Sequence, residues 1–346
     1  MNLAASVTWS LRVAAVAAVL ATTSIAQENA ADPDLQRWLV PQAWTRDTEG
    51  PIISLGPQGS FDDTHIFAPC VAAHEFSYSL WFCGSSGTVE DRVFRLGLAT
   101  SRDGRTFERH AKSPVLAFDD GRHSILTPTL LSNNNGTPLR EDGKLRLWFS
   151  STDFHDKTGR HTLHESTSRD GTSWSPPSPA LLNGVYAPTV LKDRENYRMW
   201  FTDVSKSPWV IRYAESRDGK AWEVDPTPAL VVDQAWEQDR LFYPTVRKVD
   251  GVLLMWYGSY WKGQGSQKTA LGFAVSKDGR RWTKSPHNPV LRPDAGRPWE
   301  SHYVTSQSVA LMPDGRWRIW YASRTKPPFV HKYFAIGTAT WPGPQP

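Results

Sequence analysis

One short phrase recurs along the chain and constrains its fold more than any other feature. Ser-Arg-Asp-Gly or Ser-Lys-Asp-Gly stands at four places, and an aromatic residue follows three positions after each glycine. A Pro-apolar-Leu segment comes five to seven residues after the aromatic residue. The four copies begin at Ser101, Ser168, Ser216 and Ser276. A chain that repeats itself in this way builds its fold from one small unit used several times.

A second phrase, an aromatic pair that ends an apolar run, gives the number of units. It occurs five times, roughly every 50 to 65 residues, at Trp81-Phe82, Trp148-Phe149, Trp200-Phe201, Trp256-Tyr257 and Trp320-Tyr321. Another strand-like run, such as residues 186–190, precedes each pair. Alternating apolar residues, many aromatics and Gly/Asp turns favour strands over helices. Four short strands in each of five units are typical of the blades of a β-propeller.

The last unit lacks a fourth strand, and the N-terminal part of the chain supplies a match for it. Trp44 precedes Pro51 by the same spacing that separates Trp282 from Pro289. We therefore expect residues 44–55 to complete the last blade, which removes the open sheet edges that favour aggregation. The predicted fold is all-β, a single five-bladed propeller of four-stranded antiparallel blades over residues 27–346. The expected blades are residues 61–116, 118–182, 183–232, 236–292, and 299–341 with 44–55.

Residues 1–26 have the pattern of a secretory signal peptide. They carry one charged residue, Arg12, followed by the apolar run Val13–Ala21. Ser24 and Ala26 are small residues at the positions that signal peptidase reads. The apolar run is too short to cross a bilayer core of about 30 Å. We expect a secreted or periplasmic monomer that is not held in a membrane once the signal peptide is removed.

Charge and cysteine content exclude several classes of function. The net charge is +4 and the basic residues are scattered, so no nucleic-acid partner is expected. Two cysteines cannot form a disulfide-rich scaffold or a four-cysteine zinc site. Cys70 and Cys83 face each other if the hairpin is symmetric about a loop centred near Phe76, so that positions summing to 153 pair. An exported protein also meets an oxidising compartment. We predict a cross-strand disulfide between them; the alternative is two buried free thiols.

The topology of a propeller predicts which face carries a binding site. The first strand of each blade lines the central channel, so strand-one starts and strand-two ends meet at one mouth. The Ser-Arg-Asp-Gly turns lie on the opposite face, where their aspartates have a structural role in the turn. Carboxylates, histidines, arginines and aromatics at one mouth suit a polar ligand such as a sugar. The candidate substrate-binding residues are His65, His123, Asp153, Tyr186, Arg240, Tyr243, Trp261, His302, Tyr303 and Arg324.

From Trp44 to Trp341 these repeats resemble the five-bladed propeller glycosidases of glycoside hydrolase families 43, 32 and 68 and the mannoside phosphorylases of family 130. The resemblance implies three carboxylates at the mouth, one of them directly before the strand-one proline of blade 1. In this chain that residue is Ala68, and the equivalent residues in blades 3 and 4 are Ala187 and Tyr243. Either the acids have moved to neighbouring positions or catalysis is lost.

For the first case we assign Asp63 as base or nucleophile, Asp203 as the orienting carboxylate, and Asp239 or Glu237 as acid. Glycoside hydrolysis needs one protonated and one ionised carboxyl group beside the scissile bond. A competing interpretation applies to Glu237, because an acid follows an aromatic residue at several blade starts, as in Phe61-Asp62 and Trp299-Glu300. A repeated acid is expected to be structural.

Three functions remain open. The first is a secreted glycoside hydrolase acting on a poly- or oligosaccharide, with a furanoside such as arabinan or fructan favoured by the resemblance. The second is a non-catalytic carbohydrate-binding propeller, and the third is a glycoside phosphorylase with Arg240 and Arg324 or Arg122 holding phosphate. No cofactor or metal is expected, although a central cation near His65, His123 and His302 stays open.

Overall fold

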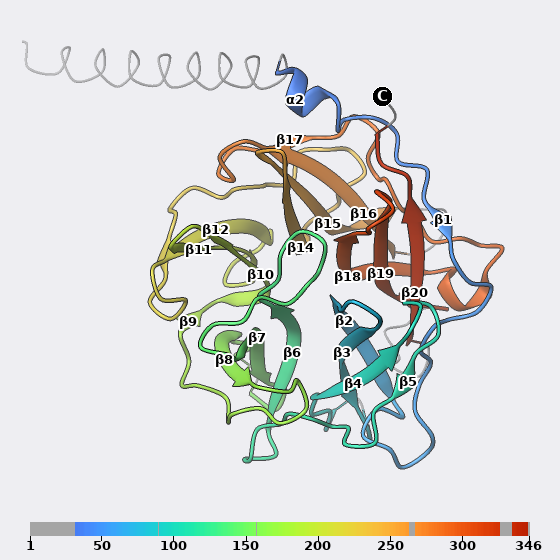
Figure 1. Cartoon of the computed structure of the whole chain (residues 1–346), viewed down its shortest axis with the longest axis vertical. Coiled ribbons are helices and arrows are strands. Elements are labelled where there is room, and N and C mark those ends of the chain that lie inside the picture. The colour runs from blue at the N-terminus through green and yellow to red at the C-terminus, as the bar shows by residue number, and fades with distance from the viewer. Residues whose placement is uncertain (1–31, 89, 157, 263–266, 326–333, 345–346) are drawn as a thin grey trace, which may run out of the picture.

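The structure is a computed structural model that describes residues 32–344 except residues 89, 157, 263–266 and 326–333 (Figure 1). The predicted signal peptide, residues 1–26, lies outside the described residues. Within the described part, no helix has the length and apolar character needed to cross a membrane. The described residues form two short helices, a four-residue α2 (Pro33–Gln36) and one 3₁₀ turn (Pro298–Glu300).

Five four-stranded antiparallel sheets surround a central axis, so the predicted five-bladed propeller is confirmed (Figure 1). Blade 1 comprises β2 (His65–Ala73), β3 (Tyr78–Ser85), β4 (Arg95–Ser101) and β5 (Glu108–Arg109). Blade 2 comprises β6 (His123–Leu130), β7 (Leu145–Asp153), β8 (Thr162–Ser168) and β9 (Leu182–Asn183). Blade 3 comprises β10 (Val185–Asp193), β11 (Asn196–Asp203), β12 (Val210–Ser216) and β13 (Glu223–Val224). Blade 4 comprises β14 (Leu241–Val249), β15 (Val252–Lys262), β16 (Gln267–Ser276) and β17 (Thr283–Lys284). Blade 5 comprises β18 (Tyr303–Leu311), β19 (Trp317–Arg324), β20 (Phe334–Trp341) and the N-terminal β1 (Thr45–Arg46).

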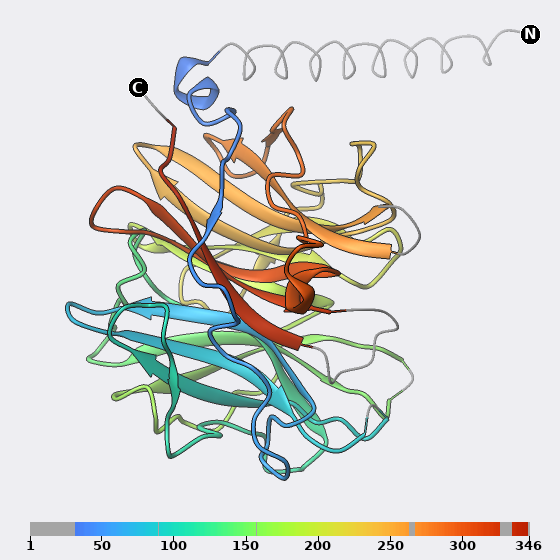
Figure 2. The same ribbon diagram turned by 90° about the vertical axis from the view of Figure 1, so that its right-hand side faces the viewer.

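Blade 5 is closed by the N-terminal segment, as the sequence predicted. Thr45 pairs with Thr340, and Ile53 forms a further bridge with Ile336. Figure 2 shows this segment running beside β20, with both ends of the described chain at the same side of the molecule. The ring therefore depends on strands from opposite ends of the sequence.

The repeated Ser-x-Asp-Gly turns join neighbouring blades at four of the five junctions. The indole of Trp200 on β11 donates to the carbonyl of Gly279 in the blade 4 turn at 2.7 Å. Gly279 has a φ of 76°, and a Cβ there would lie 2.6 Å from the Trp200 ring, so glycine is required on both counts. The same bond recurs at three other blade junctions, from Trp81 to Gly171, Trp148 to Gly219, and Trp320 to Gly104. These repeated residues are structural.

The acids that follow an aromatic residue at three blade starts are also structural. Each is fully buried and meets a cation on the fourth strand of its own blade: Asp62 with Arg109 at 2.7 Å, Glu237 with Lys284 at 2.7 Å, and Glu300 with Arg46 at 3.0 Å. A phenol of the second strand also donates to two of them, Tyr257 to Glu237 and Tyr321 to Glu300. The repeated ion pair holds the outer strand onto its blade and confirms the structural interpretation of this pattern.

Every first strand contains a β-bulge near the middle of the channel. The register of β2 against β3 shifts between Phe67 and Cys70, and the equivalent shift occurs in the other four blades. The bulged residues have positive φ, from 41° to 53°, although none is glycine: Ala68, Thr127, Ala187, Tyr243 and Ser306. Such backbone costs about 1–3 kcal/mol per residue and persists only where surrounding contacts fix it. The bulges turn the strands around a narrow central channel.

The hairpin register in blade 1 overturns the predicted disulfide. The turn pairs Ala73 with Tyr78, and the same register places Cys70 opposite Trp81; beyond the bulge, Cys83 lies opposite Phe67. Both cysteines are free and buried. Burial raises the pKa of the Cys70 thiol to about 11, which leaves it unreactive at neutral pH.

Candidate functional site

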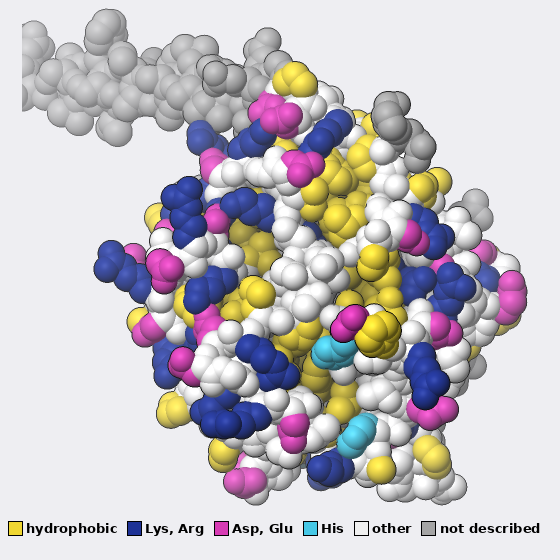
Figure 3. All heavy atoms as spheres, in the orientation of Figure 1, with side chains coloured by type: hydrophobic (Ala, Val, Ile, Leu, Met, Phe, Trp, Pro, Cys, Tyr) yellow, Lys and Arg dark blue, Asp and Glu magenta, His cyan; other side chains and the backbone are white. Residues whose placement is uncertain are grey.

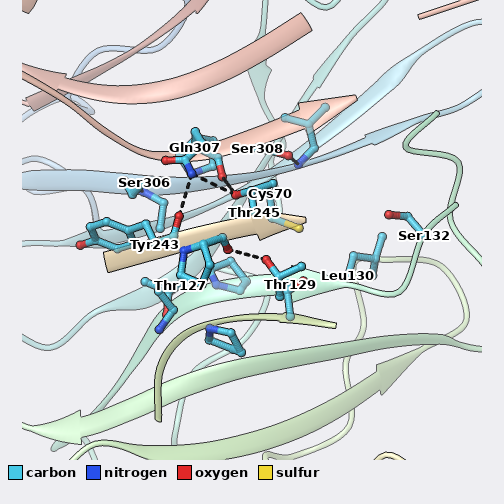
Figure 4. A pocket seen from close by; sticks show the side chains of 18 of the residues that line it. Cys70, Thr127, Thr129, Leu130, Ser132, Tyr243, Thr245, Ser306, Gln307 and Ser308 are labelled. Atoms are coloured by element: carbon cyan, nitrogen blue, oxygen red, sulfur yellow. Dashed lines mark hydrogen bonds between the residues drawn. The ribbon is translucent and has the colours of Figure 1, made fainter. Parts of the chain in front are cut away.

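A blind cavity at one end of the central channel is the candidate site. The middle of the channel retains only about 50 Å³ between the bulges, where the Gln307 amide donates to the carbonyls of Tyr243 and Trp256 (Figure 4). Beyond the channel, the β6–β7 connection crosses the axis (Figure 1), and its Asn134 accepts from the backbone of Lys248 and Leu311. Figure 3 shows this covered face, where basic and acidic side chains are interspersed.

At the opposite end the channel widens into a cavity of about 240 Å³. The strand-one starts and the connections between strands two and three of the blades surround it. Its lining residues are His65, Phe67, Arg92, Phe94, Leu126, Phe154, His161, Tyr186, Trp209, Phe242, Tyr243, Tyr260, Thr269, Tyr303, Thr305, Ser306 and Phe334. We call this space the aromatic cavity. It lies on the face that the propeller topology predicted for a binding site.

Tyrosine and tryptophan rings form a continuous wall in blades 3 and 4. The Tyr186 ring lies 6.3 Å from Trp209 and 5.3 Å from Tyr243, centroid to centroid. The two hydroxyl oxygens of Tyr186 and Tyr243 are 2.5 Å apart, so one donates to the other. Phe242 packs against Tyr260 at 5.3 Å. Flat rings with hydroxyl groups at their edges are the surfaces on which a sugar can stack and form hydrogen bonds.

Three guanidinium groups lie over rings that line the aromatic cavity. The Cζ atom of Arg92 is 3.8 Å from the centroid of Phe154, and that of Arg324 is 3.8 Å from Tyr303. Arg240 lies 4.7 Å from Trp209 and also contacts the Tyr260 ring at 5.3 Å. Cation–π stacking of this kind is favourable where the contact is desolvated. The mouth of the aromatic cavity therefore carries fixed positive charge.

Three tyrosines and one histidine of the lining are neutral near pH 7. Burial raises the pKa of Tyr186 and Tyr243 well above the ordinary value, and burial raises that of Tyr303 to about 12. Burial lowers the pKa of His161 to about 4. The tyrosines are therefore phenols rather than phenolates, and none of these three is prepared to act as an ionised nucleophile.

Each predicted catalytic carboxylate is held by partners of its own, and none of the four lines the aromatic cavity. Asp63 lies in its own turn, where it accepts from Gly59 N at 2.7 Å and from Thr64 at 2.9 Å. Asp203 accepts from Arg212 at 2.6 Å. Among the described residues, the lining of the aromatic cavity contains no aspartate or glutamate.

The other two predicted acids are also held by cations. Asp239 pairs with Arg240 at 2.8 Å and is half-exposed at the rim. Glu237 has no exposed side-chain surface and is bound by Lys284 and Tyr257, as described above. The four acids that the sequence predicted to be catalytic therefore belong to separate ion pairs and turns.

Several predicted binding residues do line or adjoin the aromatic cavity. His65, Tyr186, Tyr243 and Tyr303 line it, and Arg240 and Arg324 stack on its rings. His302 stacks on Tyr303, with ring centroids 5.0 Å apart. His123 instead pairs with Asp120 at 2.5 Å, and Asp153 pairs with Arg122 at 2.7 Å, both away from the lining. The side chain of Trp261 lies outside the described residues.

The sequence reasoning missed several residues of the wall: Arg92, Phe94, Phe154, His161, Trp209, Phe242 and Phe334. Many of them lie in the connections between the second and third strands of the blades. These connections reach the same mouth of the channel, but their sequences differ from blade to blade and contain no repeated motif. An aromatic or basic residue just before each third strand, such as Phe94 or Trp209, was the available signal. In the described part of the chain, no three His, Cys, Asp or Glu residues cluster as metal ligands would.

Comparison with known proteins supports the fold. No known protein-family profile matches the chain. An uncharacterized protein of Mycobacterium tuberculosis is 26% identical over 244 residues, which cover 65% of this chain and 76% of the relative.

Among solved structures, one described as a glycoside hydrolase has a TM-score of 0.70 and 15% identity and covers 89% of this chain and 93% of its own. A family 130 protein, reported with glycoside hydrolases that target β-1,2 mannosidic linkages in Candida mannan, has a TM-score of 0.68 and 16% identity, covering 89% and 96%. An N-acetylgalactosamine deacetylase from F. plautii has a TM-score of 0.61 and 16% identity, covering 87% and 95%. At these identities the likeness shows a shared propeller fold, and the resemblance inferred from the repeats is confirmed at that level.

Proposed function

We propose that the protein binds a saccharide in the aromatic cavity without hydrolysing it. The observation that carries this proposal is the lining itself, in which aromatic rings, tyrosine hydroxyls, histidines and an arginine converge and the described residues include no carboxylate. Such a lining can stack and orient a sugar. It lacks the acid and base that cleavage of a glycosidic bond requires.

The shape of the aromatic cavity favours the end of a saccharide chain as the ligand. Its volume of about 240 Å³ is below the roughly 300–1,000 Å³ of drug-sized pockets. The bulges and the β6–β7 connection fill the channel behind it. A single open end admits a terminal sugar unit but does not allow a long chain to pass through.

A glycoside hydrolase acting on a furanoside is the second candidate, and the fold of the solved relatives favours it. Hydrolysis would need two carboxyl groups about 5–5.5 Å apart for retention or roughly 6.5–9.5 Å apart for inversion. Among the predicted acids, Asp239 is linked to the lining through its partner Arg240, which stacks on Trp209. We also propose that the mature protein is secreted or periplasmic, on the strength of the predicted signal peptide.

One experiment separates the two candidates. Residues 27–346 are titrated with arabinan, arabinoxylan, fructan and mannan oligosaccharides, and each mixture is assayed for released reducing sugar with and without phosphate. We expect saturable binding of at least one glycan, no release, and loss of binding in Trp209→Ala. Release that stops in Asp63→Asn, Asp203→Asn or Asp239→Asn would instead establish a hydrolase. Release only with phosphate would establish a phosphorylase.

A further inference from the structure

The charge of the aromatic cavity narrows the class of saccharide, provided that the proposed function holds. The lining combines one arginine, Arg92, with two histidines and several hydroxyl groups, and the described lining has no acidic side chain. Arg240 and Arg324 add positive charge behind the rings on which they stack. Two acids oppose this charge: Asp239, which pairs with Arg240, and Glu90, which acts on Arg92 from outside the lining.

Two polar atoms of the lining point to a ligand with hydrogen-bond acceptors. The Nδ1 atom of His161 is buried and has no hydrogen-bond partner in the described structure. The hydroxyl of Thr305, a residue only 6% exposed, is also buried without a partner there. Buried polar groups are rarely left unsatisfied, because a buried donor or acceptor without a partner loses its hydrogen bonds to water and gains none in return. Both belong to the same lining as Arg92.

His161, Tyr186 and Arg92 form one side of the aromatic cavity. The His161 and Tyr186 rings are 4.8 Å apart, and Arg92 is close enough to Tyr186 for an electrostatic effect on its pKa. The neutral imidazole can carry its hydrogen on Nδ1, as the tautomer that donates. The two phenols of Tyr186 and Tyr243 have two hydroxyl hydrogens and use one between themselves, so the other can be donated to a ligand.

We propose that the saccharide is acidic and that the aromatic cavity binds the carboxylate of a terminal uronic acid through Arg92 and His161. The Arg92 guanidinium stacks on Phe154 through its face. The N–H donors of a guanidinium lie in its plane, at the edge, and from there arginine binds a carboxylate with two parallel hydrogen bonds. A single lining arginine among neutral donors matches the single charge of a carboxylate better than the double charge of a phosphate.

The test is a titration of the mature protein with oligosaccharides that end in glucuronate, galacturonate or mannuronate, each beside its carboxyl-reduced counterpart. We expect one uronate to bind at least about tenfold more tightly than its neutral counterpart, since a charge-assisted hydrogen bond contributes about 1.5–3 kcal/mol. Arg92→Gln should remove that difference, and Arg92→Lys should restore only part of it. The matched control is Arg122→Gln, an exposed arginine on the same face that pairs with Asp153.

Each other outcome has a defined meaning. Equal binding of the charged and neutral forms, or binding of neutral glycans alone, overturns the uronate proposal and leaves saccharide binding intact. Competition by inorganic phosphate at lower concentration than the uronate overturns it in favour of a phosphate site. Failure to bind any glycan overturns the proposed function as well. Thermal unfolding of Arg92→Gln checks that lost binding does not arise from misfolding.

Discussion

The two faces of this propeller are built from different kinds of sequence. On the face of the Ser-x-Asp-Gly turns, one residue pattern recurs, and Trp148 binds Gly219 just as Trp200 binds Gly279. On the other face the connections differ from blade to blade and supply Arg92, Phe154, His161 and Trp209 to one cavity. The comparison teaches that repeated residues hold the ring and that unrepeated residues make the site.

The largest expected effect comes from removing a repeated residue. Trp148 is fully buried and donates to Gly219 of the next blade. Trp148→Ala should lower the free energy of unfolding by about 3–5 kcal/mol, because it leaves a cavity between blades and an unpaired carbonyl. Chemical denaturation measures the loss. A change below about 1 kcal/mol would show that the junction is not a structural element.

The buried ion pair of blade 4 tests the same side of the comparison. Glu237→Gln removes one of the two carboxylates that Lys284, whose side chain is 6% exposed, contacts; the exposed Asp233, at 2.5 Å, remains. We expect a loss of about 1–3 kcal/mol of stability, because the buried charge-assisted hydrogen bond of Lys284 is weakened while part of its counter-charge stays. Saccharide affinity of the folded variant should stay unchanged. A stable variant that loses an enzymatic activity would instead assign Glu237 to catalysis.

Removing an unrepeated residue should lower the affinity for the saccharide and leave the stability of the fold nearly unchanged. Trp209 is partly exposed and provides a ring of the aromatic cavity beside Tyr186. Trp209→Ala should weaken saccharide binding by roughly tenfold or more and change stability by less than about 1 kcal/mol. Titration and denaturation of the same preparation measure both. A large loss of stability with unchanged affinity would break the division between the two faces.

The two faces should also differ in their response to acid. Burial opposes ionisation of Asp103, but backbone hydrogen bonds from Thr106 and Arg105 outweigh it and lower its pKa to about 2. A depressed pKa in the folded state gives stability that is present above about pH 4 and is lost as pH falls towards 2. Asp103→Asn should flatten this part of the stability curve. An unchanged acid limb in the variant would contradict the role given to the turn.

The aromatic cavity, by contrast, should not titrate across neutral pH. Burial lowers the pKa of His161 to about 4 and raises that of Tyr303 to about 12, so neither changes protonation between pH 5.5 and 8. Affinity for the saccharide should vary by less than about threefold over this range. A steep change with a midpoint near 6.5 would show that His161 is charged or that another histidine contacts the ligand.

The smallest effect concerns the cysteines. Because Cys70 and Cys83 are free and buried, a reducing agent should change neither the mass nor the unfolding temperature. A thiol-reactive dye should label no cysteine in the folded protein and two after denaturation without reductant. If the denatured, unreduced protein contains no reactive thiol, Cys70 and Cys83 form a disulfide and this account of them is wrong.

Sequence reasoning succeeded where a residue pattern repeats. Five aromatic pairs gave five blades, and the spacing from Trp44 to Pro51 predicted the closing strand, because blade junctions impose the same contact each time. The cysteine pairing failed because the turn between β2 and β3 is centred one residue earlier than the prediction assumed: Ala73 pairs with Tyr78, which places Cys70 opposite Trp81. No repeated residue marks the centre of this turn in the sequence.

The candidate site was predicted only in part. Tyr186, Tyr243 and Tyr303 were found because they begin or precede first strands, which topology places at the mouth. The acids Asp63, Asp203 and Asp239 were chosen for their charge, and a sequence does not show that Arg212 and Arg240 bind two of them. Phe154 and His161 lie in an irregular connection whose path depends on its neighbours in three dimensions.

The most direct test of the account follows one glycan through a single experiment. The tightest-binding oligosaccharide is titrated into the mature protein, held at the binding temperature overnight, and then recovered and analysed by chromatography. The account predicts saturable binding that Trp209→Ala abolishes, with the oligosaccharide recovered at its original length. Shortened products that disappear in Asp239→Asn would contradict it and make the aromatic cavity part of a hydrolytic site.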